Sequence, residues 1–199
     1  MVDVLEYFNG VVQVEPVYYN AGYKGAIDKC IVREGVAKKL EKAIELLPDG
    51  LTLRIYDAWR PICVQEELFN SFLGQIKDKH SDWDVWKIES ETIKFVTKPN
   101  YDMNNPAIHS TGGAIDLTIS YKDSGKLLDM GTPFDDFTVM SNTAFFENSD
   151  NEEVKKNRRL LYWTMTEAGF TNPPTEWWHY DYGNSFWNYY KSVRRYTAE

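Results

Sequence analysis

Two segments with alternating apolar and polar residues place the strongest constraint on the fold of this chain. The first reads LTLRIYD, at residues 51–57, and the second reads AIDLTIS, at residues 114–120. Alternation with a period of two is typical of a strand that buries one face, so we predict a strand at each position. No regular strand–helix–strand repeat connects them, and this mixed order favours the α+β class over a parallel α/β fold.

Three segments predict helices around these strands. Apolar residues recur at helical spacing over 33–47, and the sequence PDG at 48–50 ends that helix. Pro61 suits the first turn of a second helix. The segment NEEVKKNRRLLYWTMTEAGF predicts a long third helix that ends at Gly169, a residue type common at helix C-termini.

The remaining segments have weaker patterns. We interpret residues 80–98 as helical, with Trp86, Ile93 and Val96 packed inward. An ordered loop is expected at 128–137, and the segment TEWWHYDYG near the C-terminus predicts a further strand.

Length and charge limit the classes of protein and partner. A chain of 199 residues fits one domain, here residues 1–199, with a core that needs no disulfide. The net charge of −8 argues against nucleic acid, whose binding rests on neutralising phosphates. No stretch approaches the ~18 apolar residues of a membrane span, and the N-terminus has no signal-peptide pattern. We therefore expect a cytoplasmic protein with no membrane partner, or a periplasmic or secreted one if a signal was removed. The oligomeric state is left open.

The cysteines carry little information about function. Cys30 and Cys63 are the two cysteines of the chain, and they form no CxxC pair. Two buried or unreactive thiols in a reducing compartment are the simplest interpretation, with a single disulfide as the alternative.

Two of the three histidines stand in unusual surroundings. His109 opens the glycine turn HSTGGAID, and His179 closes the aromatic run TEWWHY, whereas His80 has no recognisable metal-ligand spacing. The glycines allow the chain to fold back, so that His109 approaches Asp116 on the following strand. With His179 as third ligand, this set would leave the fourth position of a tetrahedral zinc open for water.

A base and an oxyanion partner complete the hypothesis. Glu176 precedes His179 by three residues, and a carboxylate beside a metal is the usual base for its water. In a plain strand these two side chains would point to opposite faces, so the segment must bend. Arg60, in YDAWRP, follows a predicted strand and could stabilise an oxyanion.

Each of these residues also has a structural interpretation. A lone histidine is more often a satisfied polar group than a ligand. Asp116 could cap the glycine turn, Arg60 could pair with Asp57 or Glu66, and Trp178 could be a wall of the core or of a cleft.

Taken together, the motifs resemble those of the zinc D-alanyl-D-alanine dipeptidases, the VanX-like family. HSTGGAID is similar to the family motif HxxGxAxD, EWWH to the motif ExWH, and YDAWRP to the arginine-bearing segment. The resemblance continues through LDMGTPFDDF, NRRLLYWTMTEAGF and EWWHYDYGNSFW, in the same order, and covers most of the chain from about Tyr18 onward.

The resemblance implies a site and a substrate. It implies that His109, Asp116 and His179 bind one zinc ion, that Glu176 is the catalytic base, and that Arg60 stabilises the tetrahedral intermediate. The implied fold is shared with D,D-carboxypeptidases and hedgehog-type domains: an antiparallel-rich central sheet flanked by helices. The implied substrate is the free dipeptide D-Ala-D-Ala.

The resemblance also indicates substrate-binding positions and leaves alternatives. The candidate substrate contacts are Tyr19, Ala107 and Trp178, and relatives usually have serine where this chain has Ala107. The alternatives are a D,D-carboxypeptidase that acts on longer cell-wall peptides and a zinc-stabilised binding domain without catalysis. Vancomycin resistance, cell-wall turnover and use of D-alanine as a nutrient are equally compatible with such a dipeptidase.

Overall fold

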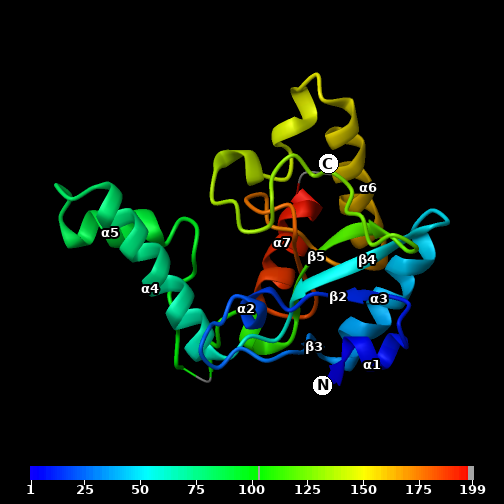
Figure 1. The fold of residues 1–199 in the computed structure, drawn as a ribbon, viewed down its shortest axis with the longest axis horizontal. Coiled ribbons are helices and arrows are strands. Elements are labelled where there is room, and N and C mark those ends of the chain that lie inside the picture. Colours follow the sequence, from blue (N-terminus) through cyan, green and yellow to red (C-terminus); the bar gives the residue numbers. More distant parts are fainter. Residues whose placement is uncertain (103, 197–199) are drawn as a thin grey trace.

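A four-stranded sheet lies at the centre of the computed structural model, which describes residues 1–102 and 104–196 (Figure 1). Its strand order is β2–β4–β5–β6; β2 pairs with β4 in parallel and the other pairs are antiparallel. A separate two-stranded antiparallel sheet pairs β1 with β3. The strands are β1 (Val2–Asp3), β2 (Gln13–Val14), β3 (Ile31–Val32), β4 (Leu51–Asp57), β5 (Ala114–Tyr121) and β6 (His179–Asp181).

Helices and short 3₁₀ turns surround the sheet, which confirms the α+β class and the antiparallel-rich sheet. The α-helices are α1 (Val4–Phe8), α2 (Val17–Asn20), α3 (Glu34–Leu46), α4 (Ile62–Lys79), α5 (Val85–Thr92), α6 (Glu152–Ala168) and α7 (Ser185–Tyr196). The 3₁₀ turns are η1 (His109–Thr111), η2 (Val139–Ser141) and η3 (Phe145–Asn148). None of the described helices is long and apolar enough to cross a membrane.

The main core lies between the sheet and the pair of helices α3 and α6, which pack against each other. Ile115, Leu117 and Ile119 of β5 are fully buried in this core, as predicted from their alternation. Asp116 and Thr118, the intervening residues, therefore point to the opposite face. They are also buried, because further chain covers that face at this end of the sheet. That second face carries the site described below.

Helices α4 and α5 extend to one side of the sheet (Figure 1). The predicted helix over 80–98 is present as α5, but two of its proposed inward residues are wrong: Trp86 is 76% exposed and Ile93 is 52% exposed. The buried face of α5 is formed by Ile88 and Thr92 instead, and Val96 is buried as expected. Because α5 has only eight residues, the spacing of its apolar residues does not determine which face of the helix is buried.

The other predicted elements hold with two differences. Helix α6 ends as predicted, because Gly169 adopts the left-handed conformation with φ of 107° and its N–H caps the helix. Pro61 is the residue before α4 and not its first helical residue. The predicted strand in TEWWHYDYG is limited to β6, since the chain before His179 forms a bend.

Candidate metal centre

Neighbouring strands bring the acidic and basic side chains of the site into register. Asp116 of β5 pairs with His179 of β6 on one side and with Asp57 of β4 on the other, where a register shift ends the ladder. Residues directly opposite one another in an antiparallel pair have Cβ atoms about 4.5–5.5 Å apart on the same face. The sheet therefore aligns three polar side chains across its end.

His109 reaches the same point from the turn before β5. It lies in η1, and Gly112, with φ of 66°, ends η1 and turns the chain into the strand. The ring is fixed by its Nδ1 atom, which is 2.8 Å from the carbonyl oxygen of Ala58 and 3.0 Å from Oδ2 of Asp57. Nδ1 therefore carries the proton, and Nε2 presents a lone pair to the centre of the site.

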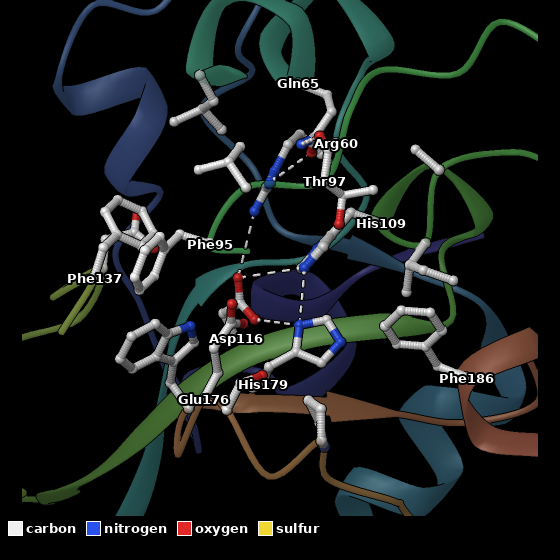
Figure 2. Close-up of a pocket in the computed structure, with 18 of the residues that line it drawn as sticks. Arg60, Gln65, Phe95, Thr97, His109, Asp116, Phe137, Glu176, His179 and Phe186 are labelled. Carbon is white, nitrogen blue, oxygen red and sulfur yellow. Dashed lines mark hydrogen bonds and ion pairs between the residues drawn. The ribbon is translucent and has the colours of Figure 1, made fainter. Parts of the chain in front are cut away.

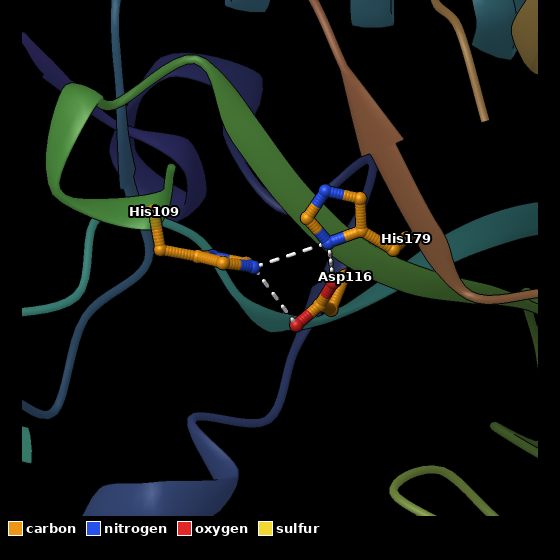
Figure 3. A group of neighbouring side chains, drawn as sticks. All are labelled: His109, Asp116 and His179. Atoms are coloured by element: carbon orange, nitrogen blue, oxygen red, sulfur yellow. Dashed lines mark hydrogen bonds and ion pairs between the residues drawn. The ribbon is translucent and has the colours of Figure 1, made fainter. Parts of the chain in front are cut away.

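Three ligand atoms converge in this buried centre (Figure 3). Nε2 of His109 is 3.2 Å from Nδ1 of His179, which is 3.0 Å from Oδ1 of Asp116. Oδ2 of Asp116 is 3.4 Å from Nε2 of His109. Atoms bound about 2.0–2.1 Å from a tetrahedral zinc stand about 3.3 Å from one another, so the spacing and the donor types both fit zinc.

A second layer of carboxylate and amide groups orients His179. Its Nε2 lies 3.0 Å from Oδ2 of Asp181, and Asn184 donates to the other oxygen of Asp181 at 2.6 Å. Nδ1 is thereby left to face the centre. Burial alone would lower the pKa of His179, but the carboxylates of Asp181 and Asp116 raise it well above its usual range. The protein thus favours a positive charge at this point.

Asp116 is held in its charged form. Burial alone would raise the pKa of its carboxyl group, but the neighbouring side chains of His109, His179 and Arg60 outweigh burial and lower it. A carboxylate that stays ionised while buried is suited to a divalent cation.

Arg60 is a buried and fixed cation beside the centre. Its Nη2 atom is 2.7 Å from Oδ2 of Asp57 and 3.4 Å from Oδ2 of Asp116, and its Nη1 donates to Gln65 at 2.8 Å. Burial alone would lower the pKa of Arg60, but the negative charges around it raise that pKa. The pair with Asp57, which the structural interpretation of Arg60 expects, is therefore present, and it also positions the guanidinium at the cavity wall.

The side chains of Arg60, His109, Asp116 and His179 line one cavity of about 250 Å³ together with Glu176 (Figure 2). Glu176 lies in the bend before β6, and its side chain is partly buried. Burial raises the pKa of Glu176 above its usual value and Asp116 raises it further, whereas the neighbouring His179 and Arg60 lower it. A raised pKa suits a carboxyl group that takes up and releases a proton.

The three candidate substrate contacts are placed differently. Ala107 and Trp178 both line the cavity and are buried. Tyr19 is 48% exposed and is not among the cavity residues; its neighbour Tyr18 lines the cavity instead. In the short helix α2 consecutive side chains point in different directions. The sequence alone did not show which of the two tyrosines faces the cavity.

Sequence reasoning missed one functional candidate, Asp135. Its carboxyl group lines the cavity and accepts a hydrogen bond from Tyr18 at 2.9 Å, and Tyr18 in turn accepts one from Arg60 at 3.2 Å. Burial raises the pKa of Asp135 to about 8. From the sequence alone, Asp135 and its neighbour Asp136 resemble turn and cap residues. Asp135 does lie in a turn, with φ of 56°, so its place in the cavity could not be recognised from this pattern.

The remaining polar candidates lie outside the site. His80 stacks on Trp83 with ring centroids 3.8 Å apart, as expected for a residue with a structural role. Cys30 is buried as expected, Cys63 is exposed, and the structure has no disulfide between these two thiols.

An α+β fold with a buried His–Asp–His cluster and a carboxyl group in the same cavity fits the class of zinc metallopeptidases. The family model described as D-ala-D-ala dipeptidase matches residues 19–196. The chain therefore belongs to this family, whose members are zinc metallopeptidases, and the resemblance seen in the motifs is confirmed.

Individual relatives give the same result. A D-alanyl-D-alanine dipeptidase of Enterococcus faecium is 31% identical over 183 residues, which cover 84% of this chain and 82% of the relative. A D-alanyl-D-alanine dipeptidase of Synechocystis sp. is 29% identical over 210 residues, which cover 89% of this chain and 80% of the relative. Among solved structures, VanYB in complex with D-alanine-D-alanine aligns with a TM-score of 0.53 at 15% identity, over 83% of this chain and 78% of that one. This last likeness supports the shared fold.

Proposed function

We propose that this chain is a zinc-dependent dipeptidase that hydrolyses D-Ala-D-Ala to two molecules of D-alanine. The observation that carries the proposal is the convergence of His109, Asp116 and His179 in a cavity that Glu176 and Arg60 also line. The first three would hold the zinc ion. The dipeptide is the substrate in the names of the relatives, and a cavity of about 250 Å³ is smaller than the ~300–1,000 Å³ of larger ligand sites.

Glu176 is the proposed base. Zinc, when bound, polarises the scissile carbonyl and lowers the pKa of water beside it. The Glu176 carboxylate takes the proton from the attacking water and then gives it to the leaving amine. Its raised pKa brings proton uptake and release closer to neutral pH. The presence of this carboxyl group in the cavity favours an enzyme over a zinc-stabilised binding domain.

Arg60 is the proposed oxyanion partner. Its hydrogen bonds to Asp57, Gln65 and Tyr18 fix the guanidinium before any substrate binds. A preorganised cation at the wall stabilises the negative charge that develops on the carbonyl oxygen, and loss of one such group costs about 10²–10³ in rate in known cases.

Asp135 is the proposed partner of the substrate's amino group. Among the residues that the structure describes, three carboxyl groups line the cavity. Asp116 is the proposed metal ligand and Glu176 the proposed base, which leaves Asp135 to bind the substrate. An ammonium group beside Asp135 would lower its raised pKa and pair with its carboxylate. Ala107 supplies no hydroxyl group, so we propose that this carboxylate provides much of the recognition at the amino end.

We also propose that residues 1–199 form one catalytic domain. The main core includes side chains from Val4 near one end to Tyr180 near the other. Asp116 and His179 lie on strands whose other face packs on this core, and His109 lies in the turn that leads into β5, so the proposed site depends on the core.

The test is release of D-alanine from D-Ala-D-Ala by the purified protein. A pentapeptide that ends in D-Ala-D-Ala is run in parallel, each with and without a chelator and with zinc added back. We expect cleavage of the dipeptide alone, its loss with chelator and its return with zinc.

Other outcomes would reject the proposal in distinct ways. Cleavage of the pentapeptide in preference to the dipeptide would identify a D,D-carboxypeptidase. Cleavage that survives full removal of zinc would reject the metal mechanism, and no cleavage of either peptide by the zinc-loaded protein would reject the D,D-peptidase activity itself.

A further inference from the structure

Glu176 and His179 present a geometric problem that the fold must solve. Three residues apart in an extended chain, they would point to opposite faces, yet both line the same cavity. The chain solves it with a bend. Backbone hydrogen bonds between Thr171 and Asp181, of 2.9 and 3.0 Å, close a loop, and the segment from 174 to 178 turns within it.

The side chain of Asn172 lies inside this loop. It is 8% exposed, and its Nδ2 atom donates two hydrogen bonds of 2.8 Å, one to the carbonyl oxygen of Glu176 and one to that of His179. Its Oδ1 atom accepts a hydrogen bond of 2.7 Å from Thr143. One amide group thus connects the two ends of the bend and is itself oriented from outside it.

We propose that Asn172 is a positioning residue for catalysis: it holds the bend between Glu176 and His179 and so sets where the Glu176 carboxylate lies relative to the metal. This inference rests on the proposed dipeptidase function. Asn172 is not expected to contact substrate, because its polar atoms are occupied by the backbone and by Thr143.

The two ends of the bend depend on Asn172 to different extents. His179 is also held by its pairing with Asp116 in the sheet, and the carbonyl of Trp178 accepts a hydrogen bond of 3.1 Å from the N–H of Leu117. Glu176 lies outside the strand, and the described residues supply no hydrogen bond to its carboxylate. Its position therefore depends on the backbone, so loss of Asn172 should disturb the base more than the ligand.

The first variant is Asn172→Ala. We expect kcat for D-Ala-D-Ala to fall about 10–100-fold, the range found when supporting partners of metal sites are removed. The KM for the dipeptide and the Kd for zinc should change much less. Asn172→Asp, which keeps the size and the oxygen that faces Thr143 but loses both donated hydrogen bonds, should lose kcat to at least the same extent.

A matched control separates this role from general stability. Asn157 on α6 is 9% exposed, and its Nδ2 donates to the carbonyl oxygen of Asp129 at 2.9 Å. It does not line the cavity. Asn157→Ala also removes a buried amide, so it should lower the unfolding temperature comparably and leave kcat unchanged.

A milder variant covers the case in which Asn172→Ala does not fold. Thr143→Val removes the hydrogen bond that orients the Asn172 amide and leaves both donated bonds in place. We expect kcat to fall in the same direction by a smaller factor.

A readout without turnover completes the test. The visible absorption of the Co²⁺-loaded protein responds to groups beside the metal, and the pH midpoint of that spectrum should shift in Asn172→Ala and stay in Asn157→Ala. A wild-type protein that cleaves neither peptide would reject the proposed function, whereas the Co²⁺ midpoint would still test Asn172. Wild-type kcat in both Asn172→Ala and Thr143→Val, an unshifted Co²⁺ midpoint, or a loss of zinc affinity as large as the loss of kcat would overturn the inference.

Discussion

At the scale of single residues, the two histidines proposed as ligands present different ring nitrogens to the centre. His109 faces it with Nε2 because Nδ1 is committed to the carbonyl of Ala58, and His179 faces it with Nδ1 because Nε2 is committed to Asp181. The sequence predicts both residues as ligands. It contains no direct information about the tautomer of His109, since its partner Ala58 is distant in the chain. The partner of His179 is Asp181, two residues along the same strand and on the same face, so strand periodicity could have indicated this contact.

Glu176→Gln tests the assignment of the base. Glutamine has nearly the same shape but cannot take a proton, so we expect kcat to fall by about 10²–10⁴ with one zinc still bound per chain. Steady-state kinetics and metal analysis of the same preparation measure both quantities. Turnover close to that of the wild type would show that another group is the base.

Asp135→Asn tests the raised pKa through stability. Burial raises the pKa of Asp135 from its usual 3.8 to about 8, so the folded protein binds this proton more tightly than the unfolded chain does. The resulting stabilisation is fully present below pH 4 and is lost as pH rises toward 8, at most about 1.4 kcal/mol per pH unit for one proton.

The measurement is denaturant unfolding of the metal-free protein at pH 5 and pH 7.5. The wild type should lose more free energy of unfolding between these values than Asp135→Asn does, because the amide does not titrate. Glu176 also has a raised pKa and is present in both proteins, so the comparison measures Asp135 together with its interaction with Glu176. An equal pH dependence in the two proteins would contradict the account of Asp135.

At the scale of elements, the periodicity of apolar residues predicted well where helices and strands lie. It predicted less well which of their side chains are buried. The bounds of β4 match the predicted 51–57, and α3 and α6 match within a residue or two. Yet Thr52 and Tyr56 of β4 are buried on the face expected to be solvated. The polar residues of β4 mark the face on which the site forms. Loops and α2 cover that face, so its side chains are buried and not exposed to water.

Gly113→Ala tests the turn that leads from η1 into β5. A Cβ atom there would lie 2.9 Å from the carbonyl oxygen of Tyr182 and against the guanidinium of Arg33. The backbone atom cannot move away without disturbing the end of β6, so we expect a loss of about 1–3 kcal/mol in the free energy of unfolding. Weaker zinc binding should accompany it, since this turn delivers His109.

The matched control is Gly74→Ala in α4. A Cβ atom at this position meets nothing within 4 Å, and alanine is favoured over glycine in a helix by about 1 kcal/mol. The control should therefore be at least as stable as the wild type with unchanged zinc affinity. If both variants behaved alike, close packing at Gly113 would not be the reason for glycine in this turn.

At the scale of the whole molecule, the site joins segments that are far apart in the chain. The motifs predicted Arg60, His109 and Glu176 because each stands in a recognisable local pattern. They could not predict Asp135 or Asn172, whose roles arise from contacts with Tyr18 and Thr143 that the folded chain creates. The required bend before His179 was predicted from elementary strand geometry, but not the residue that holds it.

The central claim is that one zinc ion lies between His109, Asp116 and His179. Crystals of the zinc-loaded protein, measured on both sides of the zinc absorption edge, test it most directly. We expect a single anomalous difference peak at bonding distance from Nε2 of His109, Nδ1 of His179 and the carboxylate of Asp116. A peak at other residues, or no peak at this site in a protein shown to contain zinc, would contradict the account.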